Sequence, residues 1–515
     1  MGELSRFALA RALSLSLLIT SCSFVLDTKQ TQCSVDADCA HFSNAENGYV
    51  TCQSGVCQKS EMGPWNCFPG DPETQTQFAT QCTTADAIPF DNCKKLGLCD
   101  VGSLSAAMRT SLTPLDLGTD PGSTVVPKPT INCADASPNI VYVTGSTNLL
   151  RLIEAVQPLL DAATTPYTVV FAPQTSCKGA DAIYSTDLTK HVIKDVPNNW
   201  AFYYKRDASD PKKYNQTYCL LDPLGNTVDV GESDIYPESC NTAYSRNTPG
   251  INDYLGPIQA ITFVVPARST QIAISAEAAH LVFGAGSNGG LVMPWTDPHL
   301  YFTRSSGTGT VQLLSRAIDV APMSWWGIDR LSATNLVQDM KTVVQNNAEQ
   351  AIGILSSDFA DNERSNLRVL AFQQKGQDFG YLPDSSAESS DKANVRDGHY
   401  PIWGAIHLLA AAAGRGPPAS EAARALILQF NDVKLDETLV KAIIAGGFIP
   451  QCAMKVTHDS ELGPLKSSFQ VPGFVSCGCL FDYQKSNRTT CQACQTSSSC
   501  PASAPSCNYG FCEKQ

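Results

Sequence analysis

The chain has fewer basic than acidic residues, and it has few histidines. It contains 36 Lys and Arg against 49 Asp and Glu, a formal net charge of -13, and 7 His. A nucleic-acid-binding protein needs a basic face to neutralise phosphates, so this balance argues against that class. The histidines are too dispersed for a metal cluster, and no serine stands in a G-x-S-x-G turn, so no hydrolase is indicated. A small anionic ligand is still possible, because backbone N–H groups bind anions locally.

Long apolar runs are absent beyond the first residues, so no later segment is predicted to span a membrane. At the start, Arg6 and Arg11 lead into a short apolar run at 12–19, as in a signal peptide. The run ends in Ile-Thr-Ser-Cys at Cys22, a string that resembles a lipobox. A plain signal peptide with a chance cysteine is the alternative. We expect residues 1–21 to be a lipoprotein signal peptide and Cys22 to carry the lipid. Ser23 then favours the outer membrane, or a periplasmic membrane face.

The chain has 21 cysteines, and removing the lipidated one leaves an even set, as in a disulfide framework. Four cysteines lie between Cys33 and Cys57 and four between Cys494 and Cys512, with similar flanking sequences. We interpret residues 22–60 and 461–515 as two disulfide-stapled modules, with a cysteine-containing linker at 61–136. Zinc ligation is the alternative, but paired C-x-x-C knuckles are absent. Because each module has its own crosslinks, the core is expected to fold without them.

From about residue 139, short β-branched runs alternate with polar turns and helical spacing. Strands are expected at 140–143, 167–171, 228–230 and 300–302, and helices at 149–160 and 311–318. Such repeats predict a largely parallel α/β sheet, whose ligands bind beyond the carboxyl ends of the strands. The Ala- and Leu-rich run around His407 is expected to be a helix.

Four of the strand ends carry Ser, Thr or Gly where a helix begins. Hydroxyl groups there stand beside unpaired backbone N–H groups, and the helix dipole adds about half a positive charge. Arg304 adds a bidentate fork suited to phosphate. Asp234 accepts hydrogen bonds only when ionised, so it would select an oxyanion that retains a proton. Singly, each residue is equally well explained as a helix cap or a surface ion pair. The set, in this order, indicates an anion site.

The order of these turns resembles the phosphate-binding proteins of ABC transporters, within the type II periplasmic-binding-protein superfamily. The matching strings are Gly145-Ser146-Thr147-Asn148, Ser176-Cys177-Lys178-Gly179, Gly231-Glu232-Ser233-Asp234, the crossover from Pro257 to Pro266, and Arg304 to Thr310. The resemblance covers about residues 137–460. It implies an α/β fold of two lobes, with lobe I at 137–255 and 370–460 and lobe II at 256–369, which close on the ligand. It also implies phosphate contacts from Ser146, Thr147, Ser176, Asp234, Arg304, Thr308, Gly309 and Thr310.

The chain departs from this family at two points. Members often carry an acidic residue two positions after the arginine, where this chain has Ser306, and small residues where it has Cys177 and Lys178. The resemblance implies a lipid-anchored solute-binding protein that takes phosphate or a similar oxyanion, with no catalysis, cofactor or metal, and an ABC transporter permease as partner. The anchor and the extra modules leave a second hypothesis open, in which a surface interaction lipoprotein keeps the fold and holds a macromolecular partner.

Overall fold

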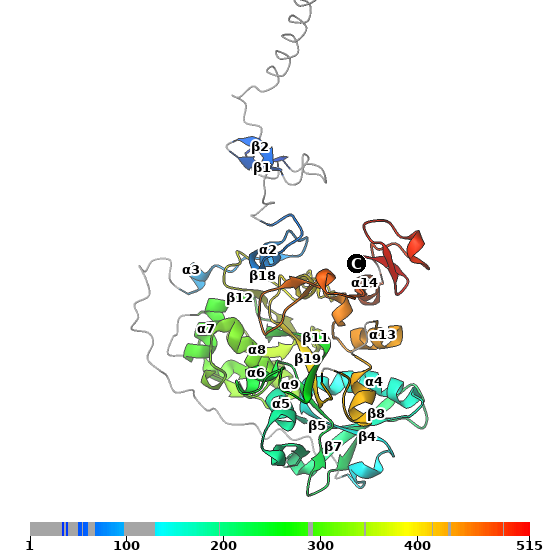
Figure 1. Ribbon diagram of the computed structural model, residues 1–515. Coiled ribbons are helices and arrows are strands. Elements are labelled where there is room, and N and C mark those ends of the chain that lie inside the picture. The colour runs from blue at the N-terminus through cyan, green and yellow to red at the C-terminus, as the bar shows by residue number, and fades with distance from the viewer. Residues whose placement is uncertain are drawn as a thin grey trace, which may run out of the picture. The chain divides into compact units, whose positions relative to one another are not determined.

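The computed structural model describes residues 33–34, 38–39, 50–53, 55–59, 67–96, 129–194, 196–286, 292–343, 347–414, 416–430, 434–487 and 489–514 (Figure 1). The expected signal peptide and Cys22 lie outside these ranges. The chain divides into two units, residues 1–72 with 80–83, and residues 73–79 with 84–515.

The strands and helices follow from β-branched runs and amphipathic runs respectively. The strands are β1 (Val50–Gln53), β2 (Val56–Lys59), β3 (Ala87–Ile88), β4 (Ile140–Ser146), β5 (Thr168–Gln174), β6 (Val192–Ile193), β7 (Trp200–Arg206), β8 (Tyr214–Leu220), β9 (Asn226–Thr227), β10 (Val230–Ser233), β11 (Ile251–Pro266), β12 (Ala273–Ser275), β13 (Tyr301–Thr303), β14 (Ile328–Asp329), β15 (Ile352–Ser356), β16 (Leu367–Val369), β17 (Ala371–Gln373), β18 (Gly380–Tyr381), β19 (Trp403–Ala411), β20 (Val456–Thr457), β21 (Lys466–Ser467), β22 (Ser506–Asn508) and β23 (Phe511–Glu513). The helices are α2 (Gln75–Thr80), α3 (Asn92–Lys95), α4 (Leu150–Ala162), α5 (Ser176–Tyr184), α6 (Pro237–Cys240), α7 (Ala276–Ala285), α8 (Gly309–Ile318), α9 (Ala333–Thr342), α10 (Ser357–Asn362), α11 (Ala393–Asp397), α12 (Glu421–Ile427), α13 (Glu437–Ala445) and α14 (Gly478–Ser486).

The smaller unit contains a hairpin of β1 and β2 in which Cys52 stands opposite Cys57. Gly55 makes the turn at a φ of 80°, a conformation that glycine adopts without strain. Disulfides join Cys33 to Cys52 and Cys39 to Cys57, so the first cysteine pairs with the third and the second with the fourth.

The larger unit ends in a second hairpin of the same kind, formed by β22 and β23. Cys507 stands opposite Cys512, and Gly510 makes the turn at a φ of 84°. Disulfides join Cys494 to Cys507 and Cys500 to Cys512, again first to third and second to fourth. The expected disulfide-rich modules at both ends are thereby confirmed, and these sulfurs are bonded to one another.

The C-terminal module packs on the rest of the larger unit more closely than the sequence indicated. Tyr509 belongs to the main hydrophobic core, and its hydroxyl donates to the carbonyl of Leu435 at 2.9 Å. Glu513 is buried and accepts from the backbone N–H of Cys479 at 2.7 Å and the hydroxyl of Ser476 at 2.9 Å. The expectation that the core shares little with this module is therefore wrong, because aromatic and carboxylate side chains extend the core into it.

We expect Glu513→Ala to lower the free energy of unfolding by about 1.5–3 kcal/mol, the usual cost of losing hydrogen bonds to a charged group. The loss leaves the Cys479 N–H and the Ser476 hydroxyl without their acceptor. Glu154→Ala, on the exposed face of α4, is the control and should change the stability by less than about 0.5 kcal/mol. Equilibrium unfolding in guanidinium measures both. Equal stabilities for the two variants would show that the module contributes little to the core.

The main sheet has the strand order β14-β13-β15-β11-β19-β10-β4-β5-β7-β8, with β16 beside β11. β4 runs parallel to β5 and β10, and β13 runs parallel to β14 and β15. The sequence predicted strands at β4, β5, β10 and β13, but not at β14 or β15. The pairs β5–β7, β7–β8, β10–β19, β11–β19 and β11–β15 are antiparallel. The sheet is therefore mixed rather than largely parallel, because a hairpin extends one side and two crossover strands lie in the middle.

Two long strands join two lobes of the larger unit (Figure 1). β11 pairs with β19 as far as Ala260 and with β15 from Ile261 onward. The expected two-lobed α/β fold is thus confirmed, while its lobe boundaries remain a prediction. The expected helix around His407 is wrong. This run is β19, buried at Trp403–Ala410 because neighbours cover both faces, and an apolar run of that kind has no periodicity that distinguishes strand from helix.

Candidate functional site

Three strand ends in lobe I meet at one edge of the sheet. Because β4 lies between β5 and β10 and is parallel to both, their carboxyl ends lie side by side. Ser146 ends β4, Ser176 begins α5 directly after β5, and Asp234 follows β10. All three are buried. The structure therefore brings together the serines and the aspartate that the turn pattern singled out.

Asp234 is the centre of this cluster. Its Oδ2 accepts from the hydroxyl of Ser176 at 3.1 Å and from the amide of Asn148 at 3.0 Å. The Ser146 hydroxyl also favours the charged form of this carboxylate. Burial raises the pKa of Asp234, against the hydrogen bonds that favour its charged form. Several donors thus converge on one buried acceptor.

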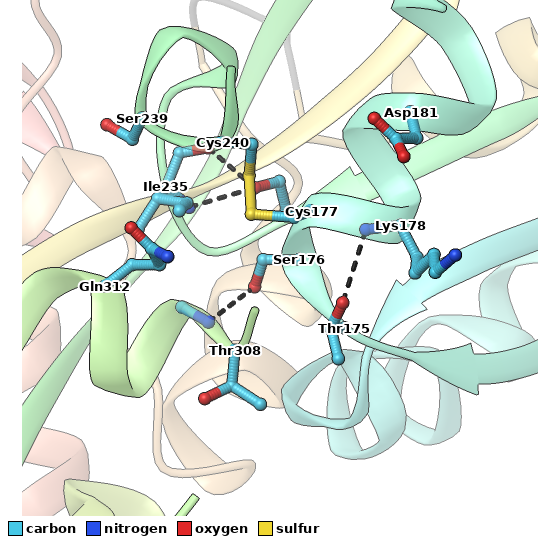
Figure 2. The surroundings of a disulfide bond; sticks show 12 residues. Thr175, Ser176, Cys177, Lys178, Asp181, Ile235, Ser239, Cys240, Thr308 and Gln312 are labelled. Carbon is cyan, nitrogen blue, oxygen red and sulfur yellow. Dashed lines mark hydrogen bonds between the residues drawn. A yellow bond between two sulfur atoms is a disulfide. The ribbon is translucent and has the colours of Figure 1, made fainter. Parts of the chain in front are cut away.

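Lobe II reaches the cluster through the start of α8. The backbone N–H of Gly309 donates to the Ser176 hydroxyl at 2.9 Å (Figure 2). A Cβ at position 309 would lie 2.5 Å from the Cβ of Asp234, so only glycine allows this approach. Thr308 caps α8, since its Oγ1 accepts from the N–H of Val311 at 3.5 Å. The predicted residues Thr308 and Gly309 therefore lie against those of lobe I.

Arg304 stands beside the cluster with its guanidinium buried. One terminal nitrogen donates to the carbonyl of Leu331 at 3.1 Å, and within the described ranges its Nε has no hydrogen-bond partner. Burial lowers the pKa of Arg304 to about 10, while the charges of Asp329 and Asp234 act in the opposite direction. The site therefore contains a buried cation with unused hydrogen-bonding capacity.

Asp329 is a site residue that the sequence reasoning missed. Members of the resembled family often carry an acid two positions after the arginine, where this chain has Ser306. Here the neighbouring acid comes from β14, in which Asp329 pairs with Thr303 of β13. Its carboxylate accepts from Ser305 at 2.6 Å. No local motif marks this residue, because it comes 25 positions later and is placed by strand pairing alone.

Glu232 is a second missed residue, at the variable position of the Gly-x-Ser-Asp string. It is fully buried beside Asp234, and burial together with that neighbouring charge holds its pKa well above the usual range. Glu232 therefore holds a proton more readily than an exposed glutamate does, and its protonated form could donate to Asp234. A Cβ at Gly145 would lie 2.2 Å from the Glu232 carbonyl oxygen, and one at Gly179 would lie 1.8 Å from it. This crowding explains the two glycines.

The remaining predicted residues lie at the edge of the cluster. Thr147 is half-buried in the short 3-10 helix at Thr147–Leu149, and Thr310 is buried in the first turn of α8. Neither side chain hydrogen-bonds to Asp234 in the ranges that the structure covers. The predicted lipidation site, Cys22, lies outside the described residues and stays a prediction.

A disulfide between Cys177 and Cys240 lies directly beside this cluster (Figure 2). It joins the first turn of α5, which carries Ser176, to α6, which follows Asp234. The N–H of Cys177 also donates to the carbonyl of Gly307 in lobe II at 3.3 Å. The cysteine that departs from the resembled family thus holds the central serine in place.

The lobes are in contact at the site. The pocket lined by Asp234, Gln259, Gly309 and Leu313 has no room for a water molecule. Apart from the guanidinium of Arg304, the donors of the site described above are paired with Asp234 or Ser176 within the described ranges. A ligand can reach them only if the lobes separate.

The chain is similar to several solved structures. One is an ABC-type phosphate transport receptor from Vibrio cholerae, at 13% identity and a TM-score of 0.38, covering 61% of this chain and 100% of that one. A phosphate-binding protein from Stenotrophomonas maltophilia matches at 12% identity and a TM-score of 0.34, covering 61% and 90%. An OxyR variant from Corynebacterium glutamicum matches at 11% identity and 0.31, covering 61% and 69%. No family model and no curated protein matches the chain.

Within the described ranges, no helix is both long and apolar enough to cross a membrane.

Proposed function

We propose that this protein is an exported, lipid-anchored solute-binding protein that holds phosphate or a similar oxyanion between its two lobes and catalyses no reaction. The anchor would be Cys22. The ligand would contact Ser146, Ser176, Asp234, Arg304 and the start of α8, with Thr147 and Thr310 near it. An ABC transporter permease is the proposed recipient of the ligand.

The observation that carries this proposal is the convergence of donors from both lobes on one buried carboxylate. The Ser176 hydroxyl, the Asn148 amide and the Ser146 hydroxyl reach Asp234, and the Gly309 N–H points at Ser176. Buried donors at a helix start, with an arginine beside them, are the chemistry that binds oxyanions. Ligands of α/β folds also bind at this edge of the sheet.

Opening of the lobes would expose these groups to solvent, and closure on hydrogen phosphate would bury the anion. Arg304 and the Gly309 N–H would then face the charged oxygens. The Asp234 carboxylate would accept the proton that hydrogen phosphate keeps at neutral pH and that sulfate lacks. The protonated Glu232 would help to keep Asp234 ionised.

One observation favours a second candidate, a surface interaction protein that keeps the fold without an anion. Asp234 already accepts from Ser176 and Asn148, so its carboxylate takes the part that a bound anion would play toward these two donors. The repeated disulfide modules would then serve a macromolecular partner.

Asp234→Asn separates the two candidates by calorimetry with phosphate and with sulfate. If the parent binds phosphate, the variant should lose preference for it, because the amide can donate where the carboxylate only accepts. Sulfate should then compete better than in the parent. Asp436→Asn, at the cap of α13, is the control and should leave anion preference unchanged.

The opposite pattern would support the second candidate. In that case the parent binds neither anion, and Asp234→Asn gains affinity for both because an internal negative charge has been removed. A parent that binds phosphate with a preference that Asp234→Asn leaves unchanged would refute the proposed role of Asp234.

A further inference from the structure

The larger unit contains a second cavity, with a volume of about 510 Å³, away from the anion site. It is walled by the crossover strands, through Ile258 of β11 and Trp403 of β19, and by the segment 451–475. This volume falls within the range of about 300–1,000 Å³ that is usual for small-molecule sites.

The cavity and the anion site lie against the same two strands. Ile258 and Trp403 line the cavity, whereas the next residues in each strand, Gln259 and Gly404, line the pocket beside Asp234. Successive residues of a strand point to opposite faces of the sheet. The cavity therefore lies behind the strands that join the lobes.

Most of the cavity wall is apolar. Met454, Leu435 and Phe474 line it, and Val471 does so while remaining 46% exposed. An apolar wall of this kind suits a ligand that is itself mainly apolar.

His458 supplies a hydrogen-bonding group inside this apolar wall. Its ring stacks on the indole of Trp403, with the centroids 4.0 Å apart and the planes at 28°. His458 is 6% exposed, and by distance and angle neither ring nitrogen is hydrogen-bonded within the described ranges. Burial lowers its pKa to about 4, so the imidazole is neutral at pH 7 and can either donate or accept.

The charged groups of the wall are neutralised by other residues. Asp253 lines the cavity and binds Nδ1 of His407 at 2.8 Å. Burial opposes the charge of His407, but Asp253 outweighs it and raises the pKa of the imidazole, which favours the charged form of this pair. Asp459 pairs with Lys466. A charged ligand would find no unpaired counter-charge among these groups.

We infer that this cavity binds a small, uncharged and mainly apolar molecule, which lies against Trp403 and Phe474 and places one polar atom on His458 after a turn of that ring, whose two nitrogens are covered by protein atoms in this structure. The inference is independent of the proposed anion binding. It rests on the cavity, its neutral wall and the buried imidazole.

The neutral fluorescent amine N-phenyl-1-naphthylamine is a suitable probe, because it is mostly aromatic and carries one N–H. Titration into the full chain should give saturable binding at one site with increased emission. Leu255→Trp and Val475→Trp, which fill the cavity from half-buried positions, should each abolish it. His458→Phe keeps a ring on Trp403 and should weaken binding about fivefold through one lost hydrogen bond. Leu224→Trp, at an 88% exposed loop position, is the control and should leave it unchanged.

Circular dichroism of each variant shows whether it folds, and having two filling variants keeps the test valid if one does not. Absence of saturable binding by the parent would overturn the inference. Probe binding that persists in a folded filling variant would place the site elsewhere. Unchanged affinity in His458→Phe would remove the assigned polar contact.

Discussion

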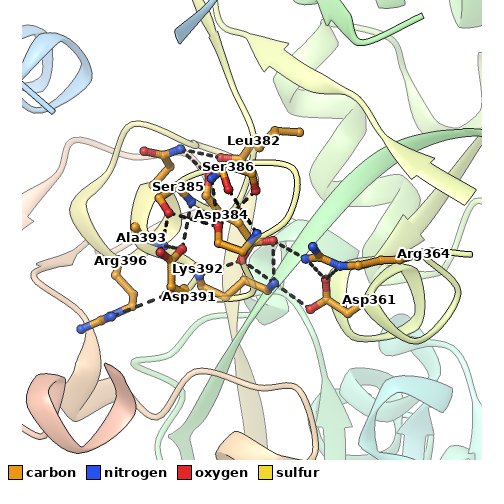
Figure 3. A network of polar contacts seen from close by, with 12 residues as sticks. Asp361, Arg364, Leu382, Asp384, Ser385, Ser386, Asp391, Lys392, Ala393 and Arg396 are labelled. Carbon is orange, nitrogen blue, oxygen red and sulfur yellow. Dashed lines mark hydrogen bonds and ion pairs between the residues drawn. The ribbon is translucent and has the colours of Figure 1, made fainter. Parts of the chain in front are cut away.

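Lys392→Met is expected to lower the free energy of unfolding by about 3–5 kcal/mol, the usual cost of removing one partner from a buried ion pair. The Lys392 side chain is 1% exposed, and its Nζ contacts both oxygens of Asp384, at 2.8 and 3.0 Å, and Asp361 at 2.7 Å (Figure 3). Methionine fills a similar volume but leaves the two carboxylates with Arg364 bonded to them and with the charge of Lys485 nearby.

The matched control for this variant is Lys441→Met, which breaks an exposed pair with Glu437 on α13. That change should cost less than about 0.5 kcal/mol. Guanidinium unfolding at several pH values measures both. Burial raises the pKa of Asp384, so in the folded variant this carboxylate takes up a proton as the pH falls and its unpaired charge is removed. The loss of unfolding free energy in Lys392→Met, relative to the parent, should therefore shrink as the pH falls. A deficit equal to that of Lys441→Met would mean that the network is not stabilising.

The second large effect is expected at Arg304 and rests on the proposed function. Arg304→Ala should weaken phosphate binding by about 2–5 kcal/mol, or roughly 30- to 5,000-fold, as for one partner removed from a buried charged pair. The guanidinium is 7% exposed, and its Nε has no hydrogen-bond partner within the described ranges, so it has a donor available for an anion.

Arg316→Ala is the control for Arg304, because Arg316 is exposed on α8 and donates only to its own helix at Gln312 in the described contacts. Its phosphate affinity should equal that of the parent by calorimetry. The phosphate affinity of Arg304→Lys should fall between those of the parent and Arg304→Ala, since lysine keeps the positive charge but lacks the paired N–H donors of a guanidinium. A parent that binds phosphate and an Arg304→Ala variant with the same affinity would place the anion away from this guanidinium.

The sequence predicted those parts of the site that depend on local pattern. Ser176, Asp234 and Gly309 each follow a β-branched strand or begin a helix, so the turn that carries them is readable in the chain. The contact between Ser176 and Asp234 followed from one rule, that parallel strands end at the same edge of a sheet, whereas Gly309 joins them through the contact between the lobes.

Other parts depend on non-local pairing and were missed. Asp329 reaches Arg304 only because β14 pairs with β13. The strand β19 went unpredicted because a doubly buried Ala/Leu run carries little periodic signal. The antiparallel hairpin of β7 and β8 was also missed, although these segments are rich in aromatic residues, which is itself a strand signal. Disulfide partners cannot be deduced from cysteine spacing alone.

Whether the bridge between Cys177 and Cys240 forms beside the site depends on the redox state of the compartment in which the chain folds. Reducing compartments keep thiols unpaired. A chain made there holds Ser176 through the cap of Thr175 and the contact of Cys177 with Gly307, without the covalent link. The bridge spans 63 positions. A crosslink that closes a loop of that length stabilises the folded state by about 4 kcal/mol, because it lowers the conformational entropy of the unfolded chain. Protein produced in a reducing host and protein matured in an oxidising one are therefore different reagents for any ligand assay.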